Sequence, residues 1–320
     1  MPDLGRIVRD IRSPSTKTLQ RAVWLLVAVL GVVVLAFAAY YVWDRYIHLD
    51  DQSPLELSIS HIEQAVRDDP ENPEARVALA ETYLTAGQYQ DAVEQATQVL
   101  KAYPDNTGAL LIAGIAHVRL GQSEAAVEPL ERFVALRKDE PMAQSDAALE
   151  AAYYFLGESY VKLNRWADAI PTLEAALRIN ATDADALYQL GLAYQASGKP
   201  EMALERYQAA VRLVPNFAEA YQAMGQSYAA LGQTDHVVYA QGMEAFSQKD
   251  YEAAVPYLEQ ATQALPDFAP AFLGLGLAYE QLGRLEEALA AVEHAAALDA
   301  HDFATQQALG RIQAALEAQN

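Results

Sequence analysis

A pair of adjacent residues, the second of which is glycine or alanine, recurs along the chain at nearly fixed intervals. The small residues of these pairs are Ala80, Gly114, Gly157, Gly191, Gly225, Gly242, Gly276 and Gly310. Their successive spacings are 34, 43, 34, 34, 17, 34 and 34 residues. A fixed period of this length indicates a repeat array, in which each unit buries its apolar face only against its neighbours. We therefore expect a stack of similar units instead of one self-sufficient core.

Other residues follow the same period. An alanine lies 12 residues after the small residue at Ala92, Ala126, Ala169, Ala203, Ala254 and Ala288. A tyrosine lies three residues after it at Tyr83, Tyr160, Tyr194, Tyr228 and Tyr279. Small residues let two helix backbones approach closely, and the aromatic ring fills the space between neighbouring units. Glycine or asparagine then ends the first helix in a left-handed cap, at Gly87, Gly121, Asn164, Gly198, Gly232 and Gly283.

This pattern resembles the tetratricopeptide repeat (TPR) family, and the resemblance covers about residues 55–316. Prolines close four of the units at matching places, at Pro70, Pro104, Pro215 and Pro266. Units of 34 residues with Leu-Gly, Tyr, Ala and Pro at these offsets are typical of the family. The resemblance implies an all-α fold, a TPR-type solenoid of helical hairpins.

Two spacings depart from the period. The step of 43 residues holds nine extra residues around 138–149, which predict an exposed loop or an extended first helix. The step of 17 is half a unit and leaves a helix at about 235–248 without a partner of its own. Because successive helices alternate in direction, a half-unit reverses every later signature helix. We therefore predict two blocks that meet at an angle, residues 55–233 and residues 234–320, the second ending in a capping helix.

Residues 22–43 carry no charge, and a run of this length is sufficient to span a bilayer as a helix. Tryptophan and tyrosine stand at its ends, where they favour the headgroup level. Two alternatives are a buried core helix and a cleavable signal peptide, although the apolar run is longer than a typical signal core. Five basic residues precede the run and only Arg45 follows it closely, which predicts a cytoplasmic segment 1–21 and an extracytoplasmic solenoid. Residues 44–54 form a tether in this single-pass arrangement, with a bacterial cell membrane as the expected location.

Composition limits the chemistry. The chain has no cysteine, so thiolate metal sites and cysteine nucleophiles are excluded. Residues 46–320 hold 16 basic and 40 acidic residues, and this charge repels nucleic-acid phosphates. The six histidines are scattered, and no catalytic constellation is evident. We expect neither an enzyme nor a cofactor or metal.

In the family that the chain resembles, first-helix residues line a groove that takes an extended or helical peptide. Transferred by register, the groove candidates are Val77, Glu81, Leu111, Ile115, Val118, Tyr154, Glu158, Val161, Tyr188, Leu192, Tyr239, Met243, Phe246, Leu273 and Leu277. Their mixture of aromatic, aliphatic and acidic groups suits a partly apolar ligand with basic residues. The alternative is that several of them pack against neighbouring helices.

The sequence therefore predicts a membrane-anchored scaffold or adaptor that binds a protein or peptide, in assembly, secretion or maturation of envelope or membrane complexes. Its contact with the lipid bilayer runs through residues 22–43, and no nucleic acid is expected. Two other hypotheses stay open: a structural subunit of a stable membrane complex, and a cytoplasm-facing TPR regulator. Self-association is compatible with each.

Overall fold

The computed structural model describes residues 16–46 and 53–319. Within these ranges it contains sixteen α-helices, one short 3-10 helix and no β-strand, so the all-α prediction is confirmed. The chain divides into two compact units, Met1–His61 and Ile62–Asn320, which are described separately below. Most of the predicted segment 1–21, and most of the tether 44–54, lie outside the described residues.

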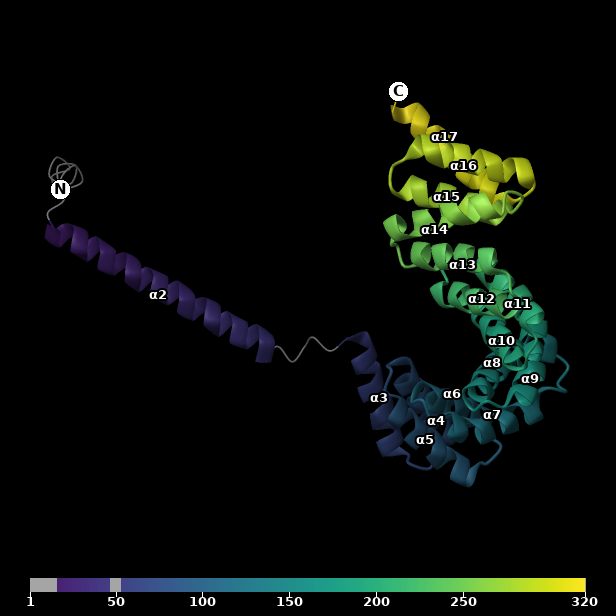
Figure 1. Cartoon of the computed structure of the whole chain (residues 1–320). Helices are drawn as coiled ribbons and strands as arrows, with labels where there is room; N and C mark the ends of the chain where they lie inside the picture. Colours follow the sequence, from purple (N-terminus) through teal and green to yellow (C-terminus); the bar gives the residue numbers. More distant parts are fainter. Residues whose placement is uncertain (1–15, 47–52, 320) are drawn as a thin grey trace. The chain divides into compact units, whose positions relative to one another are not determined.

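The first unit contains the helix α2, Thr16–Tyr46, which is 31 residues long (Figure 1). Its stretch Val23–Tyr41 is long and apolar enough to cross a membrane. Every side chain in this stretch is exposed, which differs from the buried core helix that the sequence left open. At about 1.5 Å per residue the helix is about 46 Å long, more than the hydrocarbon core of a bilayer requires.

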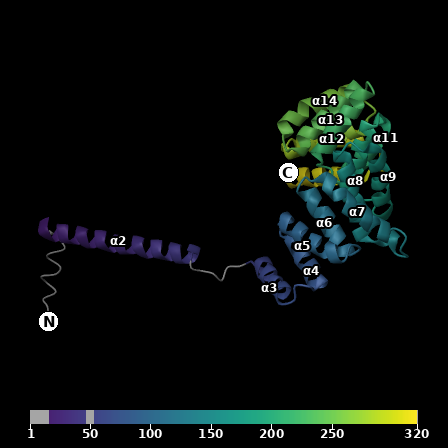
Figure 2. The ribbon, with the colours of Figure 1, turned by 90° about the horizontal axis from the view of Figure 1, so that it is seen from below.

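The second unit is a stack of helices in which each helix from α4 to α16 packs against the next along the chain (Figure 1). The first helices of the hairpins are α4 (Pro73–Thr85), α6 (Thr107–Arg119), α8 (Ala147–Lys162), α10 (Ala184–Ala196), α12 (Ala218–Ala230) and α15 (Ala269–Gln281). The second helices are α5 (Tyr89–Ala102), α7 (Ser123–Arg137), α9 (Trp166–Ile179), α11 (Pro200–Leu213), α14 (Tyr251–Ala264) and α16 (Leu285–Leu298). The helices α3 (Pro54–Asp68), α13 (Thr234–Ser247) and α17 (Phe303–Gln319) are discussed separately. In Figures 1 and 2, α8 lies toward the inner side of the curve and α9 toward the outer side.

Close contacts within each hairpin explain the periodic small residues. All six alanines of the second series are completely buried. A Cβ atom at Gly157 would lie 2.5 Å from Cγ of Leu173, and one at Gly191 would lie 2.3 Å from Cε1 of Tyr207. Such distances are far inside van der Waals contact, so only glycine allows these helices to pack as they do.

Two kinds of turn connect the helices. Inside a hairpin, the second residue after the first helix has a positive φ, as predicted, at Gly87, Gly121, Asn164, Gly198, Gly232 and Gly283. Between hairpins, an asparagine or aspartate often caps the next helix, as Asn106 does by accepting a bond from the amide of Ala109. Lys249 also has a positive φ, of 65°, which the sequence did not indicate. Two left-handed turns therefore follow one another, at Gly232 and Lys249, on either side of α13.

The periodic tyrosines connect one repeat to the next. The hydroxyl of Tyr194 donates a hydrogen bond to Glu174 of the preceding second helix, at 2.6 Å. The same bond forms from Tyr83 to Glu63, at 2.7 Å, which places the end of α3 where a second helix belongs. Tyr160 and Tyr279 donate in the same way to Glu131 and Glu259. At the fifth position the direction is reversed, because the Tyr228 hydroxyl accepts a bond from the side-chain amide of Gln208. The tyrosine position thus links neighbouring units by polar contacts as well as by packing.

The nine extra residues form both of the predicted features. A short 3-10 helix, Ala143–Ser145, interrupts the loop after α7, and α8 is 16 residues long where most first helices have 13. The loop is held at its base, because Arg137 forms an ion pair with Asp146 at 2.7 Å. Asp146 also caps α8 by accepting bonds from the amides of Ala148 and Leu149.

The half-unit is helix α13. It packs against α12 on one side and α14 on the other, so it has a partner in both directions. Consecutive first helices also contact each other from α4 through α12, and α13 continues this series with α15 and α17. Helix α12 therefore ends one series of first helices, and α13, the next helix in the chain, begins the other. At this place in the array two first helices follow one another directly.

Candidate protein-binding surface

The candidate surface consists of three positions on each first helix, here named the inner positions. They are the third residue before, the first residue after and the fourth residue after the small signature residue. Because these positions differ by three or four residues, they share one face of the helix. The predicted residues that are partly or fully exposed there are Val77, Glu81, Leu111, Ile115, Tyr154, Glu158, Tyr188, Leu192, Phe246, Leu273 and Leu277. This set combines apolar side chains with two carboxylates.

Four of the predicted groove residues are buried. They are Val118, Val161, Tyr239 and Met243, with exposed fractions between 3% and 9%. Tyr239 packs edge-on against Phe268 with ring centroids 5.0 Å apart. Met243 fills the space above Gly274, where a Cβ atom would lie 2.6 Å from its sulfur. These four side chains take part in the packing between helices, the alternative that the sequence left open.

Aromatic and acidic groups meet on helices α8 and α10. Burial raises the pKa of Tyr154, and the nearby Glu158 and Asp185 raise it further. Burial and the charges of Asp183 and Glu158 likewise raise the pKa of Asp185. The Glu158 carboxylate accepts a bond from Lys162 at 2.7 Å, but its second oxygen is buried and has no partner among the described residues. A cationic ligand group would relieve this concentration of negative charge.

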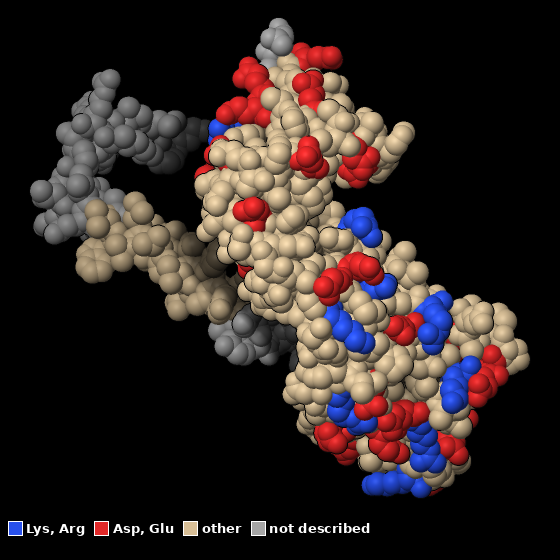
Figure 3. Space-filling model, turned by 45° about the vertical axis from the view of Figure 1, so that its right-hand side comes forward, with Lys and Arg blue, Asp and Glu red and all other residues tan. Residues whose placement is uncertain are grey.

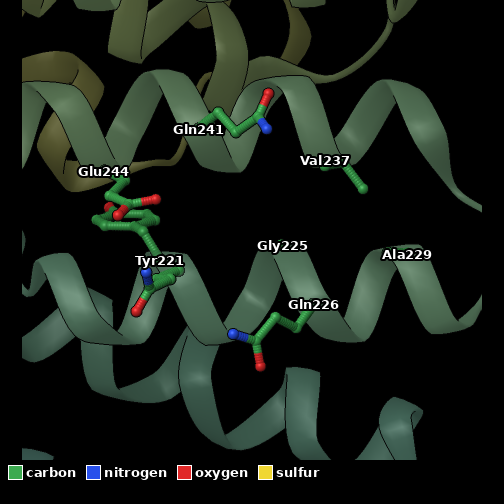
Figure 4. A pocket seen from close by; sticks show the side chains of 8 residues that line it. Tyr221, Gly225, Gln226, Ala229, Val237, Gln241 and Glu244 are labelled. Carbon is green, nitrogen blue, oxygen red and sulfur yellow. The ribbon is translucent and has the colours of Figure 1, made fainter.

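A cleft of about 340 Å³ lies between helices α12 and α13, and it is named the junction cleft here. Its lining consists of Tyr221, Gln222, Gly225, Gln226 and Ala229 from α12 and Val237, Gln241 and Glu244 from α13. Figure 4 shows Tyr221 and Glu244 at one end of the cleft and Ala229 and Val237 at the other, with Gly225 between them. One end is therefore acidic and the other apolar.

The inner positions of α12 are missing from the predicted set. They are Gln222, Gln226 and Ala229, and all three line the junction cleft. The register that selected Tyr188 and Leu192 on α10 places Gln222 and Gln226 at the same positions of α12. The repeat register therefore indicates Gln222 and Gln226 as well, although the predicted set omits them.

Charge is unevenly distributed along the array. Residues 234–320 hold thirteen acidic residues and three basic ones. On the face shown in Figure 3, the upper part of the array carries mostly acidic side chains, whereas the lower part carries both signs. No group of three or more histidine, aspartate or glutamate side chains is placed to hold a metal ion among the residues that could be searched.

Stacked helical hairpins whose first helices line one face define an α-solenoid, a class of protein that serves as a scaffold for protein–protein interaction. Family models described as "Tetratricopeptide repeat" match residues 56–95, 77–141 and 239–304, and one described as "TPR repeat" matches residues 157–198 and 196–232. The chain belongs to the tetratricopeptide repeat family. The matches stop at residue 232 and resume at residue 239, within the first turns of α13.

Two solved structures are similar to part of this chain. The chain is 29% identical to "Crystal structure of MamA", with a TM-score of 0.48 over 54% of this chain and 96% of that one. It is 21% identical to "Crystal structure of YrrB: a TPR protein with an unusual peptide-binding site", with a TM-score of 0.45 over 66% of this chain and 95% of that one. No curated protein sequence matches the chain.

Proposed function

We propose that the protein is a membrane-anchored scaffold that binds a protein or peptide through the inner positions of its first helices. The observation that carries this proposal is the row of half-exposed apolar side chains, among them Leu111, Tyr188 and Leu192, on successive first helices. Such side chains add buried apolar area when a partner covers them. Glu158 and Asp185 beside them favour a partner with basic residues.

The surface is proposed to fall into two parts, one on helices α4 to α12 and one on α13 to α17. At α13 the inner side chains Tyr239 and Met243 are buried, whereas those of α10 and α15 are half-exposed. A ligand that follows the exposed side chains therefore meets an interruption at α13. This division supports the two predicted blocks, residues 55–233 and residues 234–320.

The anchor is proposed to be α2, with residues 1–21 in the cytoplasm and the solenoid outside it. The five basic residues before the span support this orientation. An extracytoplasmic scaffold of this kind would serve assembly, secretion or maturation of complexes in a bacterial envelope. A C-terminal reporter that is active only outside the cytoplasm tests the orientation, and activity of a reporter that works only inside would refute it.

Site-directed photo-crosslinking in native membranes tests the binding surface. A photoreactive residue in place of Leu192 on α10 should form crosslinks to another protein. The same residue in place of the exposed Arg212, on the second helix α11, should form few. Equal crosslinking at both positions, or crosslinks only between copies of this chain, would count against the proposal. Stoichiometric co-purification of the partner in mild detergent would favour a subunit of a stable complex over an adaptor.

A further inference from the structure

The junction cleft exists because one packing residue of the repeat is missing. In five other hairpins, the residue sixteen positions after the small signature residue packs directly on it. These packing residues are Leu130, Leu173, Tyr207, Leu258 and Val292, and each approaches the glycine so closely that a Cβ atom there would lie within 2.3–2.7 Å of its side chain. The residue sixteen positions after Gly225 is Gln241, which is exposed. The nearest atom to a Cβ at Gly225 is Cβ of Ala240, at 3.5 Å.

This side chain is missing on the same helix that forms the half-unit. Helix α13 carries its own signature glycine, Gly242, and uses it to pack against Leu258 of α14. The residue before Gly242 is the polar Gln241, so α13 places no apolar side chain on Gly225. Gly225 therefore remains partly exposed at the base of a cleft between two first helices, whereas Gly157 and Gly191 are buried.

The groups around the cleft define the chemistry of its occupant. Val237 and Ala229 offer apolar contact at one end. At the other end, Glu244 forms no hydrogen bond or ion pair through its carboxylate with any residue that the structure describes, although it is only partly exposed. The surrounding helices α13 to α17 are strongly acidic, so they attract a cation to this carboxylate.

The amide side chains of the cleft suit a polypeptide main chain. Gln226 accepts a bond from the side chain of Gln195 at 2.9 Å, which fixes it against α10. Gln222 and Gln241 have no side-chain partner among the described residues and are exposed to the cleft. A side-chain amide both donates and accepts, so it can pair with the N–H and C=O of an extended segment.

We propose that the junction cleft binds a short extended segment of a partner protein that carries an apolar side chain close to an arginine or lysine. The apolar side chain occupies the place over Gly225 that leucine or tyrosine fills in the other hairpins, toward Val237. The basic side chain pairs with Glu244. At about 340 Å³ the cleft lies at the lower end of the range of about 300–1,000 Å³ found for ligand pockets, enough for a few side chains. This assignment rests on the proposed scaffold function and adds to it a particular point of contact between α12 and α13.

Selection of random dodecapeptides displayed on phage, against the full-length chain in lipid nanodiscs, tests the assignment. The unmodified chain should enrich peptides in which leucine, methionine or valine lies within two or three residues of arginine or lysine. Gly225→Leu fills the cleft and should lower binding of the enriched peptides about tenfold or more, a factor equivalent to the loss of one good contact. Gly310→Leu is the matched control, since it lies at the equivalent position of α17 with open space around it.

Charge reversal keeps the test decisive if Gly225→Leu disturbs folding. Glu244→Lys should shift the selected peptides from basic to acidic residues, while Glu293→Lys, an exposed carboxylate on α16, should leave the selection unchanged. The assignment is overturned if no peptide is enriched, or if enriched peptides bind Gly225→Leu and Glu244→Lys as well as they bind the unmodified chain. Binding that is lost only on substitution of Leu192 would also overturn it, yet would leave the proposed scaffold function standing.

Discussion

Glycines at the same position of the repeat differ in what they can tolerate. At Gly157 an added methyl group would overlap the side chain of Leu173, whereas at Gly225 it would meet only Ala240 at an ordinary contact distance. Both residues lie inside helices, where alanine is favoured over glycine by about 1 kcal/mol. Overpacking of a core typically costs about 1–3 kcal/mol, so the two effects compete at Gly157 and do not compete at Gly225.

We therefore predict opposite outcomes for two identical substitutions. Gly225→Ala should raise the midpoint of thermal unfolding by circular dichroism, and Gly157→Ala should lower it. A decrease for both variants would show that the α12–α13 contact is as tight as the other hairpins. Such a result would also remove the structural basis of the junction cleft.

A second prediction concerns the acidic groups at the start of α8 and α10. Burial, followed by a hydrogen bond and charge repulsion from Asp183, raises the pKa of Glu150 to about 7. In the unfolded chain this pKa is close to 4.5. The folded state therefore favours the protonated carboxyl, and this contribution is complete below pH 4.5 and is lost as the pH rises through about 7.

Glu150→Gln cannot ionise, so the variant should be more thermally stable than the unmodified chain at pH 8.5. At pH 5.5 this advantage should shrink. The exposed Glu293→Gln serves as the control and should show no such dependence on pH. A constant difference between Glu150→Gln and the unmodified chain at both pH values would contradict the assigned pKa.

At the scale of the element, the turn after α13 contains a residue that is unfavourable for its conformation. Lys249 has φ of 65°, where a residue other than glycine costs about 1–2 kcal/mol. Glycine removes this cost but is more flexible in the unfolded chain, so Lys249→Gly should stabilise the fold by about 1 kcal/mol. The reciprocal change, Gly232→Lys, should destabilise it by a similar amount. Thermal unfolding of both variants checks the pair, and stabilisation by Gly232→Lys would refute the turn assignment.

Helix positions and turns could be predicted from the sequence because each depends on local residues. The spacing of Gly225 and Gly242 indicated a half-unit, and the left-handed turn at Gly232 carried its usual glycine. The turn at Lys249 was hidden, because lysine gives no signal for a positive φ and only the packing of α13 against α14 requires it. The burial of Tyr239 and Met243 was also beyond the sequence, since it depends on which helices α13 touches.

For the candidate surface, the repeat register could predict only which side chains share one face of a first helix. Register alone placed Tyr188 and Leu192 on one face of α10, where the structure also leaves them half-exposed. The junction cleft depends on a side chain that is missing, and a pattern of present residues does not reveal an unfilled space. The sixteen-residue offset from each signature glycine to its packing residue is the sequence rule that would have found it.

At the scale of the whole molecule, the apolar stretch of α2 predicts how the protein distributes between membrane and water. The full chain should sediment with membranes and resist extraction by salt, whereas residues 53–320 should remain soluble. A chain starting at Ser53 keeps the cap of α3, because Ser53 and Glu56 each bond the other's main-chain amide. Val29→Arg together with Val33→Arg should abolish insertion, since each charge costs about 2.5–3.5 kcal/mol at mid-span. A mature protein that begins near residue 39 would instead identify α2 as a cleaved signal.

The half-unit at α13 also reverses the direction of the first helices within the array. Neighbouring helices are antiparallel, so α4, α6, α8, α10 and α12 all point one way, and α13, α15 and α17 point the opposite way. The positive ends of the helix dipoles therefore lie along one rim for the first five and along the opposite rim for the last three. A peptide that fits the first series of helices when it runs in one direction fits the second series only when it runs in the opposite direction. A partner that used both with the same motif would need to turn back on itself, or to arrive as two chains of opposite orientation.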